Sequence, residues 1–304
     1  MHKQTVTARD STTRAMYIFR LAMLCLIVAS ISACSMLRIG YEFVPWYAAW
    51  QLDRYWRLDA AQTSFAKERI DDLWRWHRRS ELPEYARWLR SSSAHLDAPV
   101  DLTEVTGWRQ TAVRHWRAVV LRVAPDLAEM IVTLRPEQIE QMKRRMASEN
   151  DDYKREFLPE GPAQRQSRRI KRIEEKIEYF FGALTDLQRD IIQRMASAMP
   201  RNEQVWFDER LARQQDFLRL AERLSRFDPK LADVQRQEAT RLTTEYLNSV
   251  WQPGDPQRRQ ALEDIMLASD EITVAVFNTA RPEQKARLSE RLLRWAADFE
   301  ALSG

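Results

Sequence analysis

Few residues in this chain have the types and spacing that catalysis requires. The sequence has no HExxH, ExxH, CxxC, G-x-S-x-G, Walker or GxGxxG motif. Three histidines follow residue 34, and one of them, His77, stands one helical turn before Glu81. These two side chains have the chemistry to share a proton or a metal, but two ligands do not make a metal site. We therefore expect no catalytic, cofactor-binding or metal-binding residues, and a polar pair on a half-exposed helix face.

Cys34 is the one cysteine whose neighbouring residues indicate a chemical modification. Four basic residues stand in the first twenty positions, followed by a short apolar run over 21–32 and then small residues. This is the layout of an export signal, and the run falls short of the about 20 apolar residues that a spanning helix needs. We expect the signal to direct the chain out of the cytoplasm and to be removed.

The residues Ile31-Ser32-Ala33-Cys34 resemble the lipobox of bacterial lipoproteins. The resemblance implies cleavage after Ala33, a thioether-linked diacylglycerol on Cys34 and an acyl chain such as palmitate on the new amine. Several acyl chains together anchor a protein stably. The alternative is an ordinary secretion cut at Ala33. Ser35 stands where an aspartate would resemble an inner-membrane retention signal, which favours the outer membrane, and Met16 is an alternative start.

The charge balance changes once the signal is set aside. The whole chain is formally +4, but from Cys34 onward it has 44 basic and 43 acidic residues. This balance excludes the basic footprint of a nucleic-acid-binding protein. With Cys25 in the signal and Cys34 lipidated, no disulfide is expected in an oxidising periplasm. Six glycines in 304 residues, and an abundance of good helix formers, favour helices.

Prolines and aspartates divide the rest into predicted helices, and no segment alternates with the period of a strand. We expect an all-α fold, an elongated multi-helix bundle of long antiparallel helices. Pro83 and Pro125 are expected to interrupt or kink helices. The predicted helix starts are Pro45, Asp59, Asp101 or Thr103, Pro136, Glu203, Asp228, Asp255 and Pro282.

Four parts are predicted: a signal peptide over 1–33, a lipidated N-terminus and short tether over 34–44, a Trp-rich helical half over 45–158 and a C-terminal helical half over 159–304. Proline and glycine cluster at Leu158–Pro162, which sets the boundary between the halves. One continuous domain is the alternative. In the second half, apolar residues at spacings of 3 and 4 predict a seam for a partner helix. The seam comprises Ile170, Ile173, Ile177, Phe180 and Leu184, and is expected to continue through Leu187 and Ile191.

Four predicted helix starts place a glutamine four residues after an apolar residue. These starts, called glutamine frames below, are Leu58–Gln62, Leu134–Gln138, Leu184–Gln188 and Ala280–Gln284. The main interpretation is a recurring capped helix start. The frame Leu184-Thr185-Asp186-Leu187-Gln188 also resembles the LTxxQ motif of Spy-like periplasmic chaperones, small all-α cradles, which implies a chaperone-like role.

A broader resemblance rests on the lipobox, Leu58-Asp59 with Gln62, Trp76-His77-Arg78-Arg79 and Glu81-Leu82-Pro83-Glu84-Tyr85. Together they resemble an uncharacterised proteobacterial lipoprotein family that is known only as a domain of unknown function. The resemblance implies a lipid-anchored helical periplasmic protein and carries no activity.

Tryptophan is concentrated near the predicted anchor, with eight of eleven between Trp46 and Trp116. The main interpretation is a core whose indole N–H groups find partners. In the alternative, Trp46 and Trp50 rest on the membrane interface, because indoles favour the headgroup zone. The basic run over 165–172 is followed by three glutamates, which predicts a self-compensated face; contact with anionic lipid is the alternative.

The leading hypothesis is a non-enzymatic, lipid-anchored binding or scaffold protein on the periplasmic side of the outer membrane, with a chaperone-like role as one version. Its expected partners are the membrane, through the lipid, and an envelope protein, but no nucleic acid. No cofactor is expected beyond the covalent lipid on Cys34. The alternative is an envelope hydrolase with dispersed acidic catalytic residues.

Replacing the lipidated thiol tests the anchor. We expect Cys34→Ala to block lipid attachment and to leave the protein unprocessed or loosely held on the membrane, because the alanine has no sulfur to form the thioether. Metabolic labelling with fatty acid measures this, with Cys25→Ala as the control that keeps its label. Label on the Cys34→Ala protein would refute the assignment.

Overall fold

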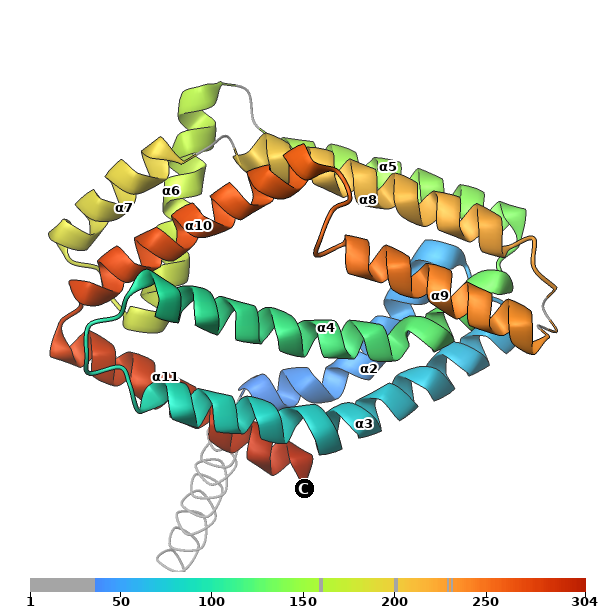
Figure 1. Cartoon of the computed structure of the whole chain (residues 1–304), viewed down its shortest axis with the longest axis horizontal. Helices are drawn as coiled ribbons and strands as arrows, with labels where there is room; N and C mark the ends of the chain where they lie inside the picture. The colour runs from blue at the N-terminus through green and yellow to red at the C-terminus, as the bar shows by residue number, and fades with distance from the viewer. Residues whose placement is uncertain (1–35, 159–160, 200–201, 229, 231) are drawn as a thin grey trace, which may run out of the picture. The chain divides into compact units, whose positions relative to one another are not determined.

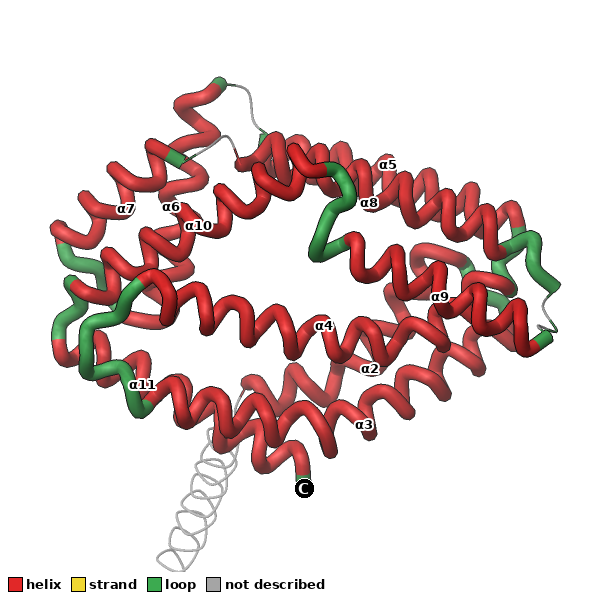
Figure 2. The backbone as a smooth tube through the Cα atoms, viewed as in Figure 1, coloured by secondary structure: helices red, strands yellow, loops and turns green. Residues whose placement is uncertain are grey.

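The computed structural model describes residues 36–158, 161–199, 202–228, 230 and 232–304. Within these residues every regular element is an α-helix and none is a strand (Figure 2), so the prediction of an all-α multi-helix bundle is confirmed. Ala33 and Cys34 lie outside the described residues, as does the rest of the predicted signal peptide. No helix in the described part is both long enough and apolar enough to cross a bilayer.

The chain divides into two compact units between Val44 and Pro45. The described part of the first unit, 36–44, is the beginning of α2, and all the other helices belong to the second unit. The helices are α2 (Met36–Trp56), α3 (Ala60–Ser93), α4 (Leu102–Val132), α5 (Pro136–Phe157), α6 (Pro162–Phe181), α7 (Asp186–Ala198), α8 (Asn202–Leu224), α9 (Asp233–Ser249), α10 (Pro256–Asn278) and α11 (Pro282–Ser303).

Within the second unit, helices that are distant in sequence pack side by side (Figure 1). The last helix, α11, lies along α3, and α9 lies along α4. Next to them, α8 packs on α5, while α7 packs on both α6 and α10. Helices from 45–158 are therefore covered by helices from 159–304, and their buried faces form joint apolar clusters.

Prolines occupy two kinds of position in these helices. Pro136, Pro256 and Pro282 stand in the first turn, as expected, where the missing N–H has no intrahelical partner to lose. Pro45 lies instead inside α2, so the expectation that it begins a helix is wrong: α2 already begins at Met36. Pro83 and Pro125 also lie inside unbroken helices. An interior proline removes one backbone hydrogen bond, which a helix of 21 to 34 residues can lose and still remain continuous.

The predicted apolar seam stops earlier than expected. Gly182 adopts φ +81° directly after α6, a conformation that ends the helix and that glycine adopts without strain. Leu184 is buried beyond this turn, but Leu187 opens a new helix and is 57% exposed. The extension of the seam through Leu187 is therefore wrong, because the helical phase is reset at residues 182–185.

All four glutamine frames begin helices: α3, α5, α7 and α11. In each, the glutamine side-chain oxygen accepts a hydrogen bond from the backbone N–H of the N-cap residue, at 2.9 to 3.1 Å. In two frames the side-chain oxygen of the N-cap residue, Asp59 or Thr185, accepts a hydrogen bond from the backbone N–H of the glutamine. The helix-start interpretation is confirmed, and each frame satisfies donors that a helix leaves unpaired.

The four glutamines also meet in two pairs. Gln138 donates to Gln62 at 2.7 Å and Gln62 donates back at 3.2 Å. Gln188 and Gln284 exchange bonds of 3.1 and 3.0 Å in the same way. All four side chains are buried, the most exposed at 7%. Each pair joins the starts of two helices that are 76 or 96 residues apart in sequence.

In three of the four glutamines, the other amide hydrogen reaches a backbone carbonyl of a neighbouring turn. Gln62 donates to Thr133 O at 2.9 Å and Gln138 to Trp56 O at 3.1 Å. Gln284 donates to Ala183 O at 2.9 Å, in the turn after α6. The two pairs lie at opposite ends of the second unit, right and left in Figure 1. Each pair thus ties a loop to two helix starts.

Breaking one pair tests its contribution to stability. We expect Gln188→Ala to lower the free energy of unfolding by about 1–3 kcal/mol, because Thr185 N–H and the Gln284 amide lose buried partners. In a double-mutant cycle with Gln284→Ala, the two losses should be non-additive. Urea unfolding followed by circular dichroism measures both. The control is Gln260→Ala, at an exposed glutamine on α10, which should leave the free energy of unfolding nearly unchanged. An equal loss of stability for Gln188→Ala and Gln260→Ala would contradict the pairing.

Candidate functional site

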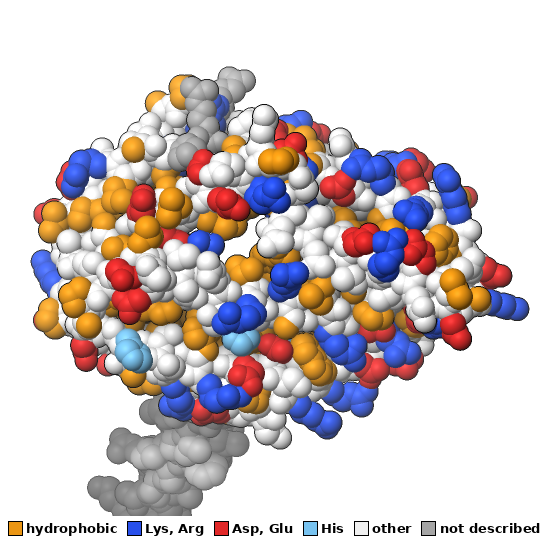
Figure 3. Space-filling model, viewed as in Figure 1, with side chains coloured by type: hydrophobic (Ala, Val, Ile, Leu, Met, Phe, Trp, Pro, Cys, Tyr) orange, Lys and Arg blue, Asp and Glu red, His pale blue; other side chains and the backbone are white. Residues whose placement is uncertain are grey.

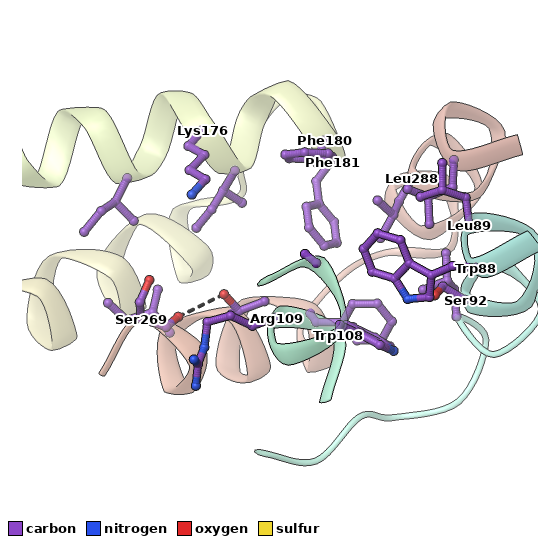
Figure 4. A pocket seen from close by; sticks show the side chains of 18 residues that line it. Trp88, Leu89, Ser92, Trp108, Arg109, Lys176, Phe180, Phe181, Ser269 and Leu288 are labelled. Carbon is purple, nitrogen blue, oxygen red and sulfur yellow. Dashed lines mark hydrogen bonds between the residues drawn. The ribbon is translucent and has the colours of Figure 1, made fainter. Parts of the chain in front are cut away.

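A cavity of about 390 Å³ lies among α3, α4, α6, α10 and α11 (Figure 4). Its wall is mostly apolar and includes Trp88, Trp108, Phe180 and Phe181. Small-molecule sites typically occupy about 300–1,000 Å³ and combine such a wall with a few polar groups. The cavity has the size and chemistry of a site for an apolar group.

Part of the predicted seam forms one side of this cavity. Ile173, Ile177 and Phe180 line it from α6, and all three are half-buried rather than sealed in a core. Ile177 packs on both neighbouring apolar clusters. The seam therefore packs against α7 and α10 as predicted for a partner-helix contact, while its edge remains accessible from the cavity.

The charged residues of the cavity, Arg109 and Lys176, lie away from Trp88, whereas Ser92 lies beside it. Figure 4 shows the Lys176 side chain extending from α6 toward the cavity, across from Ser269. The Arg109 guanidinium is directed away from it and pairs with Asp270 at 2.8 Å. No ion pair or hydrogen bond joins Lys176 to another described residue. Its ammonium group is thus the unpaired charge at the rim.

A second cavity, of about 370 Å³, shares Arg109, Ile173, Lys176 and Ser269 with the first. Its wall carries two further cations, Arg169 and Arg172, on α6. Both approach the buried carboxylate of Glu203 on α8, at 3.1 and 3.8 Å. Four cations therefore line the two cavities, and Glu203 and Asp270 are carboxylates that pair with the three arginines.

The predicted self-compensated face is only partly formed by these residues. Lys171 pairs with Glu175 within α6 at 3.8 Å. Arg169, by contrast, is buried and crosses to Glu203, while Glu178 pairs with Arg189 of α7 at 2.7 Å. The charges of α6 are therefore compensated partly by residues of other helices, because α6 packs against α7 and α11. Elsewhere on the face seen in Figure 3, basic and acidic side chains are interspersed.

Both members of the polar pair predicted at His77 and Glu81 are buried. His77 Nε2 lies 3.2 Å from the Tyr85 hydroxyl, and Glu81 lies 3.4 Å from Nδ1 of His115 on α4. The expectation of a half-exposed face is wrong because α11 covers this side of α3: Phe299 contacts the Tyr85 ring.

Burial sets the chemistry of this cluster. Desolvation lowers the pKa of His77 to about 4 and raises the pKa of Tyr85 to about 12, the latter aided by the nearby charge of Glu81. His77 also stacks on Trp74, with ring centroids 5.4 Å apart. The cluster is therefore a buried polar core whose members bond to one another. The described residues contain no group of three or more His, Cys, Asp or Glu placed to hold a metal.

The other predicted site residues lie on α2. Trp46, Tyr47 and Trp50 are exposed by 66, 50 and 42%, and the two indoles stack with centroids 6.3 Å apart. Trp56, by contrast, is buried and donates to the sulfur of Met142 at 3.0 Å. The tryptophans thus range from buried, as Trp56, to exposed, as Trp116 and the two in the aromatic row of Trp46, Tyr47 and Trp50.

A family model that matches residues 54–247 is described as a family of unknown function, DUF6279. The chain belongs to this family. The predicted resemblance to a domain of unknown function is confirmed for residues 54–247. The match covers the motifs over 58–85 but begins after the lipobox. No curated protein and no solved structure matches the chain.

The cavity was not predicted from the sequence, because its wall comes from five helices that no local pattern brings together. One signal was available: the seam on α6 has isoleucines and a phenylalanine on one face with Lys176 next to Ile177. The DUF6279 match includes α3, α4 and α6 but ends before α10 and α11, which complete the wall.

The buried imidazole predicts a pH effect on stability. Because the pKa of His77 is about 4 when folded and about 6.5 otherwise, the unfolded chain binds the proton more readily. Stability should fall by roughly 3 kcal/mol as the pH drops from about 6.5 to 4. Unfolding free energies of wild type and His77→Gln measure this: the variant should lose this part of the pH dependence, whereas His95→Gln, an exposed control, should keep it. Parallel pH profiles for wild type and His77→Gln would contradict the assignment.

Proposed function

We propose that this DUF6279 protein is a lipid-anchored binding protein on the periplasmic side of the outer membrane, and that its ligand occupies the cavity among α3, α4, α6, α10 and α11. The observation that carries the proposal is the accessible apolar wall of about 390 Å³. Burying such a wall against a ligand releases about 25 cal/mol for each Å² of apolar surface removed from water. As long as this apolar wall faces water, it contributes no such free energy to the stability of the protein.

The placement at the membrane rests on the lipobox resemblance and on the aromatic row. Trp46, Tyr47 and Trp50 stand within about 16 residues of Cys34 and expose their rings. Tryptophan and tyrosine favour the interfacial zone of a bilayer. In this proposal the row rests on the leaflet that holds the lipid anchor.

The chaperone-like version is less well supported by the glutamine frames. Gln188, in the frame that resembles LTxxQ, is completely buried and bonded to Gln284. Its amide is used by the fold, so a client would have to bind elsewhere. A small ligand in the cavity accounts for the accessible surface without that requirement.

Filling the cavity tests the proposal. Ala112 lines it and is exposed to it, so Ala112→Phe should occupy the space without disturbing a packed contact. We expect a photoreactive hydrocarbon probe, added to membranes that contain the full chain, to label the walls of α3 and α6 in wild type. Labelling at these positions should fall severalfold in Ala112→Phe, as measured by peptide mass spectrometry.

The matched control is Ala301→Phe, an exposed alanine on α11 that does not line the cavity. It should leave the labelling of α3 and α6 unchanged. Labelling confined to the aromatic row of α2, or labelling that Ala112→Phe does not reduce, would mean that the cavity takes no ligand.

A further inference from the structure

We propose that the ligand of this cavity is a long-chain fatty acid, with its carboxylate on Lys176 and its acyl chain along the apolar wall toward Trp88 and Trp108. This inference rests on the proposed function and specifies its substrate class. It follows from two features of the cavity: the shape of the wall and the position of the unpaired charge.

The wall requires an apolar group that is longer than it is wide. Its residues run from Lys176 and Ser269 at one end to Trp88 and Leu89 at the other, and Figure 4 shows Phe180 and Phe181 between them. Each methylene buried there contributes about 0.8 kcal/mol. The volume of about 390 Å³ lies near the lower limit for small-molecule sites, which suits one acyl chain rather than the two of a phospholipid.

The rim requires an anionic headgroup. Arg109 is neutralised by Asp270, at 2.8 Å, and Arg169 by Glu203, at 3.1 Å. Lys176 lines both cavities and has no ionic partner among the described residues. Arg172, which lies 3.8 Å from Glu203 and over the Phe157 ring, is the nearest further cation. A headgroup at this point therefore meets the ammonium of Lys176, which no carboxylate of the described residues shares.

A carboxylate matches this rim. The Lys176 ammonium, at one end of the apolar wall, can pair with the two oxygens of one carboxylate. Such charge-assisted hydrogen bonds contribute more binding free energy than hydrogen bonds between neutral groups. Ser269, across from Lys176, offers a hydroxyl at the same rim. The headgroup therefore sits where the two cavities join, with the chain in the first and solvent access through the second.

Palmitate is the probe. The full chain, extracted from membranes in mild detergent and stripped of bound lipid, is titrated with palmitate and followed by native mass spectrometry. We expect one palmitate per chain. Lys176→Glu should weaken the apparent affinity about tenfold or more, because a charge-assisted bond is replaced by repulsion.

The matched control is Lys171→Glu, the same charge change on the same helix at an exposed lysine away from both cavities. It should leave the affinity within about twofold. Lys176→Gln is the second variant if the glutamate disturbs folding, as judged by circular dichroism. Hexadecanol, with the same chain and no charge, should bind more weakly than palmitate and should not respond to Lys176→Gln.

The outcomes separate this inference from the proposed function. Palmitate and hexadecanol binding alike, or palmitate binding unaffected at Lys176, overturns the carboxylate site but leaves the apolar cavity as a binding site. Tighter binding of a lysophospholipid than of palmitate overturns the fatty acid in favour of a phosphate headgroup. If no chain binds, and Ala112→Phe changes no labelling, both proposals fail.

Discussion

The hydrogen bonds between paired glutamines hold the second unit together at both ends. One pair joins the starts of α3 and α5, and the other joins the starts of α7 and α11. A buried amide that lost its partner would be destabilising, so each pair restricts two helix starts and a neighbouring turn at once. Because α3 and α11 pack along each other, the two pairs are connected through the longest contact of the fold.

The cavity depends on this arrangement. Gln284 holds the carbonyl of Ala183, directly after the turn at Gly182 that ends α6. The end of α6 is therefore fixed relative to the start of α11, and both helices contribute to the apolar wall, where Phe181 and Leu288 belong to one cluster. The buried polar cluster around His77 adjoins the same wall, since Trp88 lines the cavity and contacts His115.

Local sequence signals predicted the helices well and their packing poorly. Caps and first-turn prolines, such as Asp101 and Pro282, set helix starts through bonds within one turn, and these starts are as expected. The burial of Glu81 depends on α11, a helix far along the chain whose contact periodicity does not specify. The glutamines were visible as a repeat, but their pairing requires helices 76 or 96 residues apart to meet. The cavity requires five such helices.

The family match ends at residue 247, inside α9, whereas α10 and α11 supply Ser269, Phe277 and Leu288 to the cavity wall. The helix that carries Lys176 belongs to the matched part. The matched part also supplies Trp88, Trp108 and Phe180 to the wall, so α10 and α11 complete a wall that the matched part begins. For the proposed fatty acid, substitutions in α10 and α11 would change the shape of one part of the wall while Lys176 stays in place, so the chain that fits would differ between proteins that share the matched part.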